Sequence, residues 1–211
     1  MVNLISRGGP IMYPLLVCSV VSLAIVIERA IFWLRMSRIS DRPLVFKILE
    51  LAEQGAYDVA YQAGKKSRDY IVRMLINGIA HRNYSLPRAL EMGADEAVKR
   101  MRRYLNILDT IITVAPLLGI FGTVLGIINS FDILGLAEIA QPQVVTRGIA
   151  QALITTATGL AVAIVTLIPY NYFLSRIENF SKEMEKFASS LEITFEKGLN
   201  RGVSSSPEEK A

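Results

Sequence analysis

Residues 148–171 (GIAQALITTATGLAVAIVTLIPYN) contain no charged side chain, but they carry a glutamine and four threonines. A hydroxyl or an amide can donate and accept hydrogen bonds, yet neither ionises near neutral pH. At 100° per residue, most of these groups fall on one helical stripe about 80° wide, which Val162 interrupts. The stripe holds Gln151, Thr155, Thr158 and Thr166, whereas Thr156 lies to one side. These side chains can therefore form hydrogen bonds, but they cannot bind or release a proton near neutral pH.

A second stripe lies in residues 110–131 (TIITVAPLLGIFGTVLGIINSF), within an arc of about 120°. Its members are small or polar: Gly119, Gly122, Thr123, Gly126, Asn129 and Ser130. Small residues four apart allow two helix backbones to approach closely in a membrane. One interpretation is therefore that both stripes are packing seams, with each hydroxyl bonded to the carbonyl four residues earlier.

The other interpretation is that the stripes line a hydrated path or contact a partner helix. Two stripes on one chain cannot enclose a path, so this interpretation requires an oligomer. Neither stretch holds Asp, Glu, His, Lys or Arg. Because proton paths in membranes generally use a titratable group, that group would have to come from another polypeptide.

The elements that would position these residues are membrane helices. Uncharged blocks cover residues 11–27, 110–131 and 148–175, and mean hydropathy is +0.37. A span needs about 20 apolar residues; the first block is shorter, but residues 30–34 extend it. A signal peptide is the alternative for this block, yet no small-residue cleavage site follows it. The sequence predicts three spans.

The distribution of Lys and Arg predicts the orientation, because cytoplasmic flanks are enriched in both. Residues 35–103 hold 14 of them and residues 176–211 hold 6, whereas the stretch 133–146 has none. We therefore expect a periplasmic N-terminus and a cytoplasmic C-terminus. The predicted segments are a periplasmic N-terminus (1–10), spans at 11–34, 106–134 and 147–175, a cytoplasmic helical region (35–105), a periplasmic loop (135–146) and a cytoplasmic C-terminal helix and tail (176–211).

The cytoplasmic part also has a helical pattern, so the predicted fold class is an all-α membrane protein with long cytoplasmic helical extensions. One helix should end at Gly55, a second should be capped by Ser67, and a third by Ser85 with Pro87 in its first turn. No stop signal follows until about Gly135, which predicts one continuous helix there. The third span should likewise continue past Arg176.

Several classes of function lack support in the sequence. The single Cys18 and single His81 exclude a Cys or His metal cluster built by this chain. No phosphate-binding Gly-rich loop or nucleophile–base pairing is present, so we expect no cofactor, no metal and no enzyme activity. The net charge of +4 is explained by basic flanks that face lipid headgroups, without nucleic acid.

The motifs APLLGIFGTVLGII (115–128) and GIAQALITTATGLAVAIVTLIPYN (148–171) resemble the paired transmembrane motifs of the MotA/TolQ/ExbB proton-channel family. Three spans and about 70 cytoplasmic residues are similar to its ExbB/TolQ branch. The resemblance implies a pentameric ring around two copies of an ExbD/TolR-like subunit, whose single span supplies an aspartate. It also implies a TonB- or TolA-like protein as a further partner.

The resemblance also implies roles for single residues. Thr123 and Thr156 match the family's pore-facing threonines, and with Gln151, Thr155 and Thr158 they form the expected ion-pathway and partner-facing set. Pro116 matches the motif proline; the expected helix-packing or kink residues are Pro116, Gly119, Gly122, Gly126 and Pro169. Gln151 departs from the family, which usually has glutamate at this position, so a proton relay is not expected from its amide.

The expected function is thus that of an inner-membrane subunit of a proton-driven motor, which transmits energy to the cell envelope, for example for TonB-dependent import. Two alternatives stay open from the sequence. One is a sodium-driven version of the same motor, because threonine oxygens can coordinate Na⁺. The other is a non-conducting helical scaffold in which the polar stripes only join helices.

Overall fold

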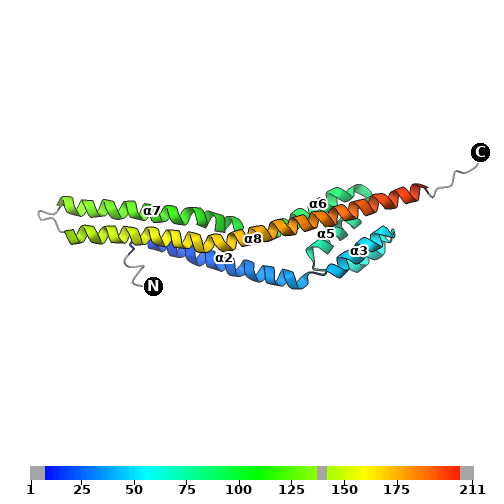
Figure 1. The fold of residues 1–211 in the computed structure, drawn as a ribbon, viewed down its shortest axis with the longest axis horizontal. Helices are drawn as coiled ribbons and strands as arrows, with labels where there is room; N and C mark the ends of the chain where they lie inside the picture. The colour runs from blue at the N-terminus through cyan, green and yellow to red at the C-terminus, as the bar shows by residue number, and fades with distance from the viewer. Residues whose placement is uncertain (1–7, 137–141, 205–211) are drawn as a thin grey trace, which may run out of the picture. The chain divides into compact units, whose positions relative to one another are not determined.

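The computed structural model describes residues 8–136 and 142–204, and every regular element in these ranges is an α-helix. This confirms the all-α class. The helices are α2 (Met12–Ile39), α3 (Arg42–Glu53), α4 (Tyr57–Gly64), α5 (Tyr70–Ala80), α6 (Arg82–Met101), α7 (Leu105–Leu136) and α8 (Pro142–Ser204) (Figure 1). The chain divides into two compact units: unit 1 consists of Met1–Ala30 and Tyr104–Phe173, and unit 2 of Ile31–Arg103 and Leu174–Ala211.

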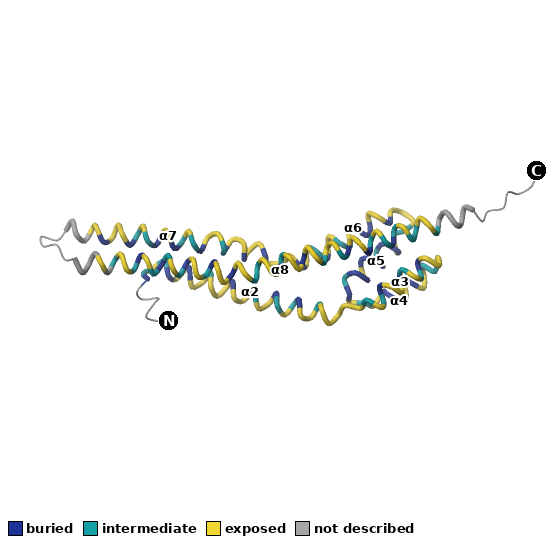
Figure 2. Tube along the Cα trace, in the orientation of Figure 1, coloured by how far each residue is buried: buried dark blue, intermediate teal, exposed yellow. Residues whose placement is uncertain are grey.

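Three helices are long and apolar enough to cross a membrane, as predicted. They are Met12–Ile39, Leu105–Asp132 and, within α8, Gly148–Gly198. At most 28% of the residues in their most apolar windows are buried, and Figure 2 shows exposed positions along each of them. The exposed side chains include many Leu, Ile, Val and Phe residues. An exposed apolar surface of this kind suits contact with lipid.

In unit 1, α7 and the first half of α8 lie side by side (Figure 1). The start of α2 packs with α7 through a small core of Met12, Leu15, Ile111 and Ala115, against which Val162 of α8 also packs. Just before α2, Gly9 has a φ of +75°, a conformation that favours glycine. The chain therefore turns at Gly9, directly before α2 begins.

The chain breaks between α6 and α7, so the expectation of one continuous helix from Ser85 to about Gly135 is wrong. Tyr104 adopts a φ of 65°, the one positive value outside glycine among the described residues. This left-handed conformation costs about 1–2 kcal/mol in a non-glycine residue. The Arg29 guanidinium lies over the Tyr104 ring, 5.8 Å from its centroid, and is itself buried beside Glu28. The break thus depends on tertiary contacts, which the local sequence does not reveal.

In unit 2, the helices α3–α6 pack around large apolar side chains. The fully buried ones include Ile48, Ile71, Met74, Leu75, Ile79, Leu90 and Met101. Gly55, with a φ of 71°, follows α3 as predicted. Ser85 has extended backbone before the turn that contains Pro87, also as predicted. The cap of α5 was predicted wrongly: the carboxylate of Asp69, not Ser67, accepts from the N–H of Ile71 at 2.7 Å.

The helix α8 continues without interruption from unit 1 into unit 2, which confirms that the third span extends past Arg176. Its buried side chains in unit 2 are Ile177, Met184, Phe187 and Leu191, at intervals of seven, three and four residues. This spacing places them along one face of the helix. The predicted loop at 135–146 is helical at both ends, and its residues 137–141 lie outside the described part. Residues 1–7 of the predicted N-terminus (1–10) and residues 205–211 of the predicted C-terminal helix and tail (176–211) also lie outside it.

Candidate functional site: the seam between α7 and α8

The glycines of α7 lie directly against the backbone of α8 in the same chain. A Cβ added at Gly119 would lie 3.0 Å from the Cα of Thr156, and one at Gly126 would lie 3.0 Å from the Cβ of Ala152. At Gly122 an added Cβ would collide with the Thr155 side chain. These three predicted packing residues therefore let two helices of one subunit approach closely.

Sequence reasoning missed the matching glycine on α8. Gly159 is buried, and a Cβ there would lie 3.1 Å from the Cα of Gly119 and would collide with the carbonyl oxygen of Ala115. The signal was present, because small residues recur every three or four positions along α8. The buried members of this series are Ala152, Thr155, Gly159 and Ala163.

Two of the predicted threonines donate hydrogen bonds to other segments of unit 1. The Thr156 hydroxyl donates to the carbonyl oxygen of Gly119 on α7, at 2.9 Å. The Thr155 hydroxyl lies between two carbonyl oxygens, that of Gly8 at 2.8 Å and that of Gln151 at 3.0 Å. Thr155 is 1% exposed, whereas Thr156 is half-buried. Thr155 thus holds the N-terminal segment, and Thr156 holds α7 to α8.

The other hydroxyls of the two stripes donate to their own helix. Thr158 and Thr166 donate to the carbonyls four residues earlier, at 2.8 and 2.7 Å. Thr123 donates to the carbonyl of Ile120 at 2.5 Å, and Ser130 to that of Gly126 at 2.7 Å. Thr123 and Thr158 are half-buried, so both keep an accessible side. The hydroxyl-to-own-helix hydrogen bonds expected for a packing seam therefore hold for some of these groups. Thr155 and Thr156 in addition donate to other segments, to Gly8 and Gly119.

Gln151 lies close to the N-terminal segment. A Cβ added at Gly9 would collide with Nε2 of Gln151, so the amide packs on the Gly9 backbone. The side chain is half-buried. Gln151 and Thr155, one turn apart, therefore both contact the segment Gly8–Gly9, which the sequence patterns did not place at this seam.

The two predicted proline positions lie inside helices that continue through them. Pro116 is half-buried in α7 and Pro169 is half-buried in α8. A proline has no N–H, so each leaves the carbonyl four residues earlier without its usual helical donor. These are the carbonyls of Ile112 and Val165. Each proline therefore leaves one polar backbone group of an apolar span available.

The uncharged stretches around this seam contain no acidic or basic side chain. Residues 110–131 and 148–171 hold no Asp, Glu, His, Lys or Arg. Within the described residues, no three His, Cys, Asp or Glu side chains lie close enough together to hold a metal ion. The seam can bind by hydrogen bonds and close packing, and a proton acceptor would have to be supplied by another polypeptide.

Comparisons with known proteins agree with this architecture. Residues 65–186 match the model of the MotA/TolQ/ExbB proton channel family. A putative biopolymer transport protein, ExbB-like 3, of Synechocystis is 33% identical over 96% of both chains. The biopolymer transport protein ExbB of Salmonella typhimurium is 28% identical over 93% of this chain and 84% of its own. The Tol-Pal system protein TolQ of Haemophilus influenzae is 35% identical over 47% of this chain and 44% of its own.

The family match covers more than half of the 211 residues, including both membrane motifs, and the ExbB-like relative aligns along nearly the whole chain. The apolar helix Leu105–Asp132 and both uncharged stretches of the seam lie within residues 65–186. The chain therefore belongs to the MotA/TolQ/ExbB proton channel family, within its ExbB/TolQ-like branch.

Proposed function

We propose that this chain forms the outer ring, a pentamer, of a proton-driven motor around the membrane helices of an ExbD/TolR-like partner. The partner's aspartate carries the proton, and its movement is transmitted to a TonB- or TolA-like protein in the envelope. The N-terminus lies in the periplasm and the C-terminus in the cytoplasm. Membership of the ExbB/TolQ branch itself gives the coarser statement: the chain is an inner-membrane protein of the energy-transduction type, from a family of transport proteins and not of enzymes.

One observation supports this proposal most directly: residues 110–131 and 148–171 of two apolar spans carry threonine hydroxyl groups but no Asp, Glu, His, Lys or Arg. A passive apolar span needs neither a threonine nor an accessible hydroxyl, and a self-sufficient proton path generally needs a carboxylate or histidine. Thr123 and Thr158 are half-buried with an accessible side. The spans are therefore suited to receive a carboxyl group supplied by a partner.

The direction of the hydrogen bonds suggests how the hydroxyls act on that carboxyl group. A hydroxyl has one donor hydrogen and two acceptor lone pairs. In Thr123, Thr156 and Thr158 the hydrogen is already donated to a backbone carbonyl. Each oxygen therefore offers a partner an acceptor. An acceptor pairs with a protonated carboxylic acid, which donates, and not with a carboxylate, which only accepts.

This asymmetry gives a mechanism for coupling. The protonated aspartic acid of the partner is stabilised beside the threonines, whereas the ionised carboxylate is stabilised in water. Proton binding on one side of the membrane and release on the other then change which surface the partner helix prefers. A ring of identical subunits would repeat this preference and bias the rotation of the partner helices.

The test is proton flux in liposomes that contain this chain and a co-purified ExbD/TolR-like partner. A pH-sensitive dye inside the liposomes reports flux in sodium-free buffer after a membrane potential is applied. We expect flux that is lost when the partner's intramembrane aspartate is replaced by asparagine, while the complex stays assembled. Flux only when sodium is present would identify a sodium-driven motor. Absence of flux with both cations from an intact complex would leave the scaffold interpretation.

A further inference from the structure

A hollow in unit 2, outside the membrane seam, concentrates positive charge. It has a volume of about 450 Å³ and lies among α4, α5 and α6. Its charged lining consists of Lys65, Arg73, Glu96 and Arg100, and the side chains of Tyr61 and Tyr70 also line it. We call it the basic hollow. Three cations line it, one directly after α4, one in α5 and one in α6, against one carboxylate.

The single carboxylate of the basic hollow is already engaged. Glu96 accepts a hydrogen bond from Arg100 at 2.6 Å, one helical turn away. This bond raises the pKa of Arg100 above its ordinary value, so the guanidinium stays charged. Lys65 and Arg73 form no ion pair with any residue that the structure describes. The hollow therefore keeps two positive charges that the described residues do not neutralise.

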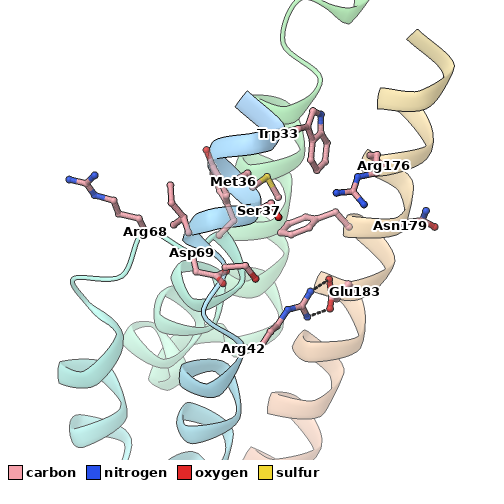
Figure 3. Close-up of a pocket in the computed structure, with 13 residues that line it drawn as sticks. Trp33, Met36, Ser37, Arg42, Arg68, Asp69, Arg176, Asn179 and Glu183 are labelled. Carbon is pink, nitrogen blue, oxygen red and sulfur yellow. Dashed lines mark hydrogen bonds and ion pairs between the residues drawn. The ribbon is translucent and has the colours of Figure 1, made fainter. Parts of the chain in front are cut away.

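A second cavity in unit 2 contains arginines that have interaction partners on other helices (Figure 3). It has a volume of about 330 Å³, and three arginines line it. There Arg42 is paired with Glu183, and Arg176 lies over the Trp33 ring, 5.4 Å from its centroid. The side chain of Arg68 extends away from the others in Figure 3. In that cavity Arg42 and Arg176 contact side chains of other helices, whereas Lys65 and Arg73 of the basic hollow form no ion pair with a described residue.

The donors of the basic hollow fit a phosphate group. Guanidinium groups bind phosphate through paired hydrogen bonds, and an ammonium group adds a point charge. Phenol hydroxyls can donate further bonds, and the rings of Tyr61 and Tyr70 offer apolar surface to an attached organic group. A volume of about 450 Å³ lies within the range of small-molecule sites. We propose that the basic hollow binds a phosphate group, carried either by a small soluble phosphate or by a phospholipid headgroup.

Two experiments on the full-length protein distinguish the two sources. In the first, the protein in nanodiscs of phosphatidylcholine alone is titrated with inorganic pyrophosphate, and binding is measured by isothermal titration calorimetry. In the second, the nanodiscs also contain phosphatidic acid, and bound lipid is counted by native mass spectrometry. Binding in the first identifies a soluble ligand, and enrichment of phosphatidic acid in the second identifies a lipid.

The variant Lys65→Gln/Arg73→Gln should weaken whichever binding is observed about tenfold, because it removes charge-assisted hydrogen bonds. The matched control is Lys66→Gln/Arg88→Gln, which removes the same charge from exposed positions that do not line the hollow. It should change binding less than about twofold. If the double variant does not fold, Arg73→Lys replaces it and should weaken binding severalfold, since it loses the paired donors.

The proposal is overturned if neither pyrophosphate nor phosphatidic acid binds, or if the control variant weakens binding as much as the variant of the hollow. The second result would indicate attraction to the general positive charge of unit 2. Proton flux does not enter either measurement, so the outcome is independent of the proposed motor function.

Discussion

The two units hold their helices together with different side chains. In unit 2, α5 and α6 bury large apolar side chains such as Leu75, Leu90 and Met101. At the α7–α8 seam of unit 1, the contacting residues are Gly119 and Gly126 on one helix, with Ala152, Thr155 and Gly159 on the other. The α5–α6 contact is filled by large side chains, whereas the α7–α8 seam lets two helix backbones approach closely.

The solvent explains this difference. In water, burying apolar surface contributes about 25 cal/mol per Å², so large side chains are the efficient way to join helices. In lipid that driving force between helices is absent, and association depends on close packing and interhelical hydrogen bonds. The seam of unit 1 therefore uses small residues and the bond from Thr156 to Gly119. The composition of each contact surface thus indicates which solvent its unit is built for.

The largest effect should come from a cavity in unit 2. Leu75 is completely buried, and Leu75→Ala should destabilise unit 2 by about 2–5 kcal/mol, as in other buried leucines. Hydrogen exchange measured by mass spectrometry should show faster exchange in α4–α6 and unchanged exchange in α7. Val59→Ala, at an exposed position of α4, is the control and should change little. If hydrogen exchange in α7 were accelerated as much as in α4–α6, the stability of unit 1 would depend on the apolar core of unit 2, and the contrast between the two units would be wrong.

A smaller effect should follow from adding volume at the seam of unit 1. In Gly119→Val the new side chain meets the backbone of α8 at Thr156, which cannot move aside as a side chain can. Overpacking of this kind costs about 1–3 kcal/mol. We expect a lower melting temperature of the detergent-solubilised complex. It is measured by size-exclusion chromatography after heating to a series of temperatures. Ile120→Val, exposed on the next position, is the control; a similar loss there would indicate general sensitivity of α7.

Much of this architecture could be predicted from the sequence, because its signals are periodic. Uncharged blocks predicted the three apolar helices, and the spacing of small residues predicted a close contact on α7. The pattern could not say which helix makes that contact. Gly122 would also suit packing against a neighbouring subunit, but in the structure it faces Thr155 of the same chain. Periodicity identifies a face of a helix and not the surface opposite it.

Features that depend on contacts distant in sequence were not predicted. The break at Tyr104 has no Gly or Pro to indicate it, and the structure places the buried Arg29 against its ring. The segment Gly8–Gly9 was assigned only to the N-terminus, whereas it contacts Gln151 and Thr155. The roles of Thr123, Thr156 and Gln151 toward a partner stay predictions, since they concern a second polypeptide.

Two threonines of α8 allow the seam to be tested with one substitution at two positions. Thr156 donates across to Gly119, whereas Thr158 donates to Ile154 of its own helix. Thr156→Val should therefore lower the stability of the complex by about 0.6 kcal/mol, the average for hydrogen bonds between membrane helices, and by no more than about 1.7 kcal/mol. Thr158→Val should leave stability nearly unchanged. Both should reduce proton flux in liposomes, because both remove an acceptor; full flux in either variant would remove that threonine from the proposed path.

The smallest effect should come from the ion pair between Arg42 of α3 and Glu183 of α8 in unit 2. Both side chains are partly exposed, at 42% and 29%, so water screens their attraction. The guanidinium of Arg42 also lies over the Phe187 ring, 5.8 Å from its centroid, which Arg42→Gln would disturb as well. A double-mutant cycle with Arg42→Gln and Glu183→Gln separates the ion pair from the ring contact, because only the interaction between Arg42 and Glu183 contributes to the coupling energy.

We expect a coupling energy of about 0.2–1 kcal/mol for this pair, measured from melting temperatures at low salt, and a smaller one at high salt. A coupling energy above about 3 kcal/mol would place the pair among buried ion pairs. In that case charge, and not only the volume of apolar side chains, would hold α8 within unit 2. The contrast with the uncharged seam of unit 1 would then be sharper, since the same helix would be held by hydroxyl groups and small residues in one unit and by an ion pair in the other.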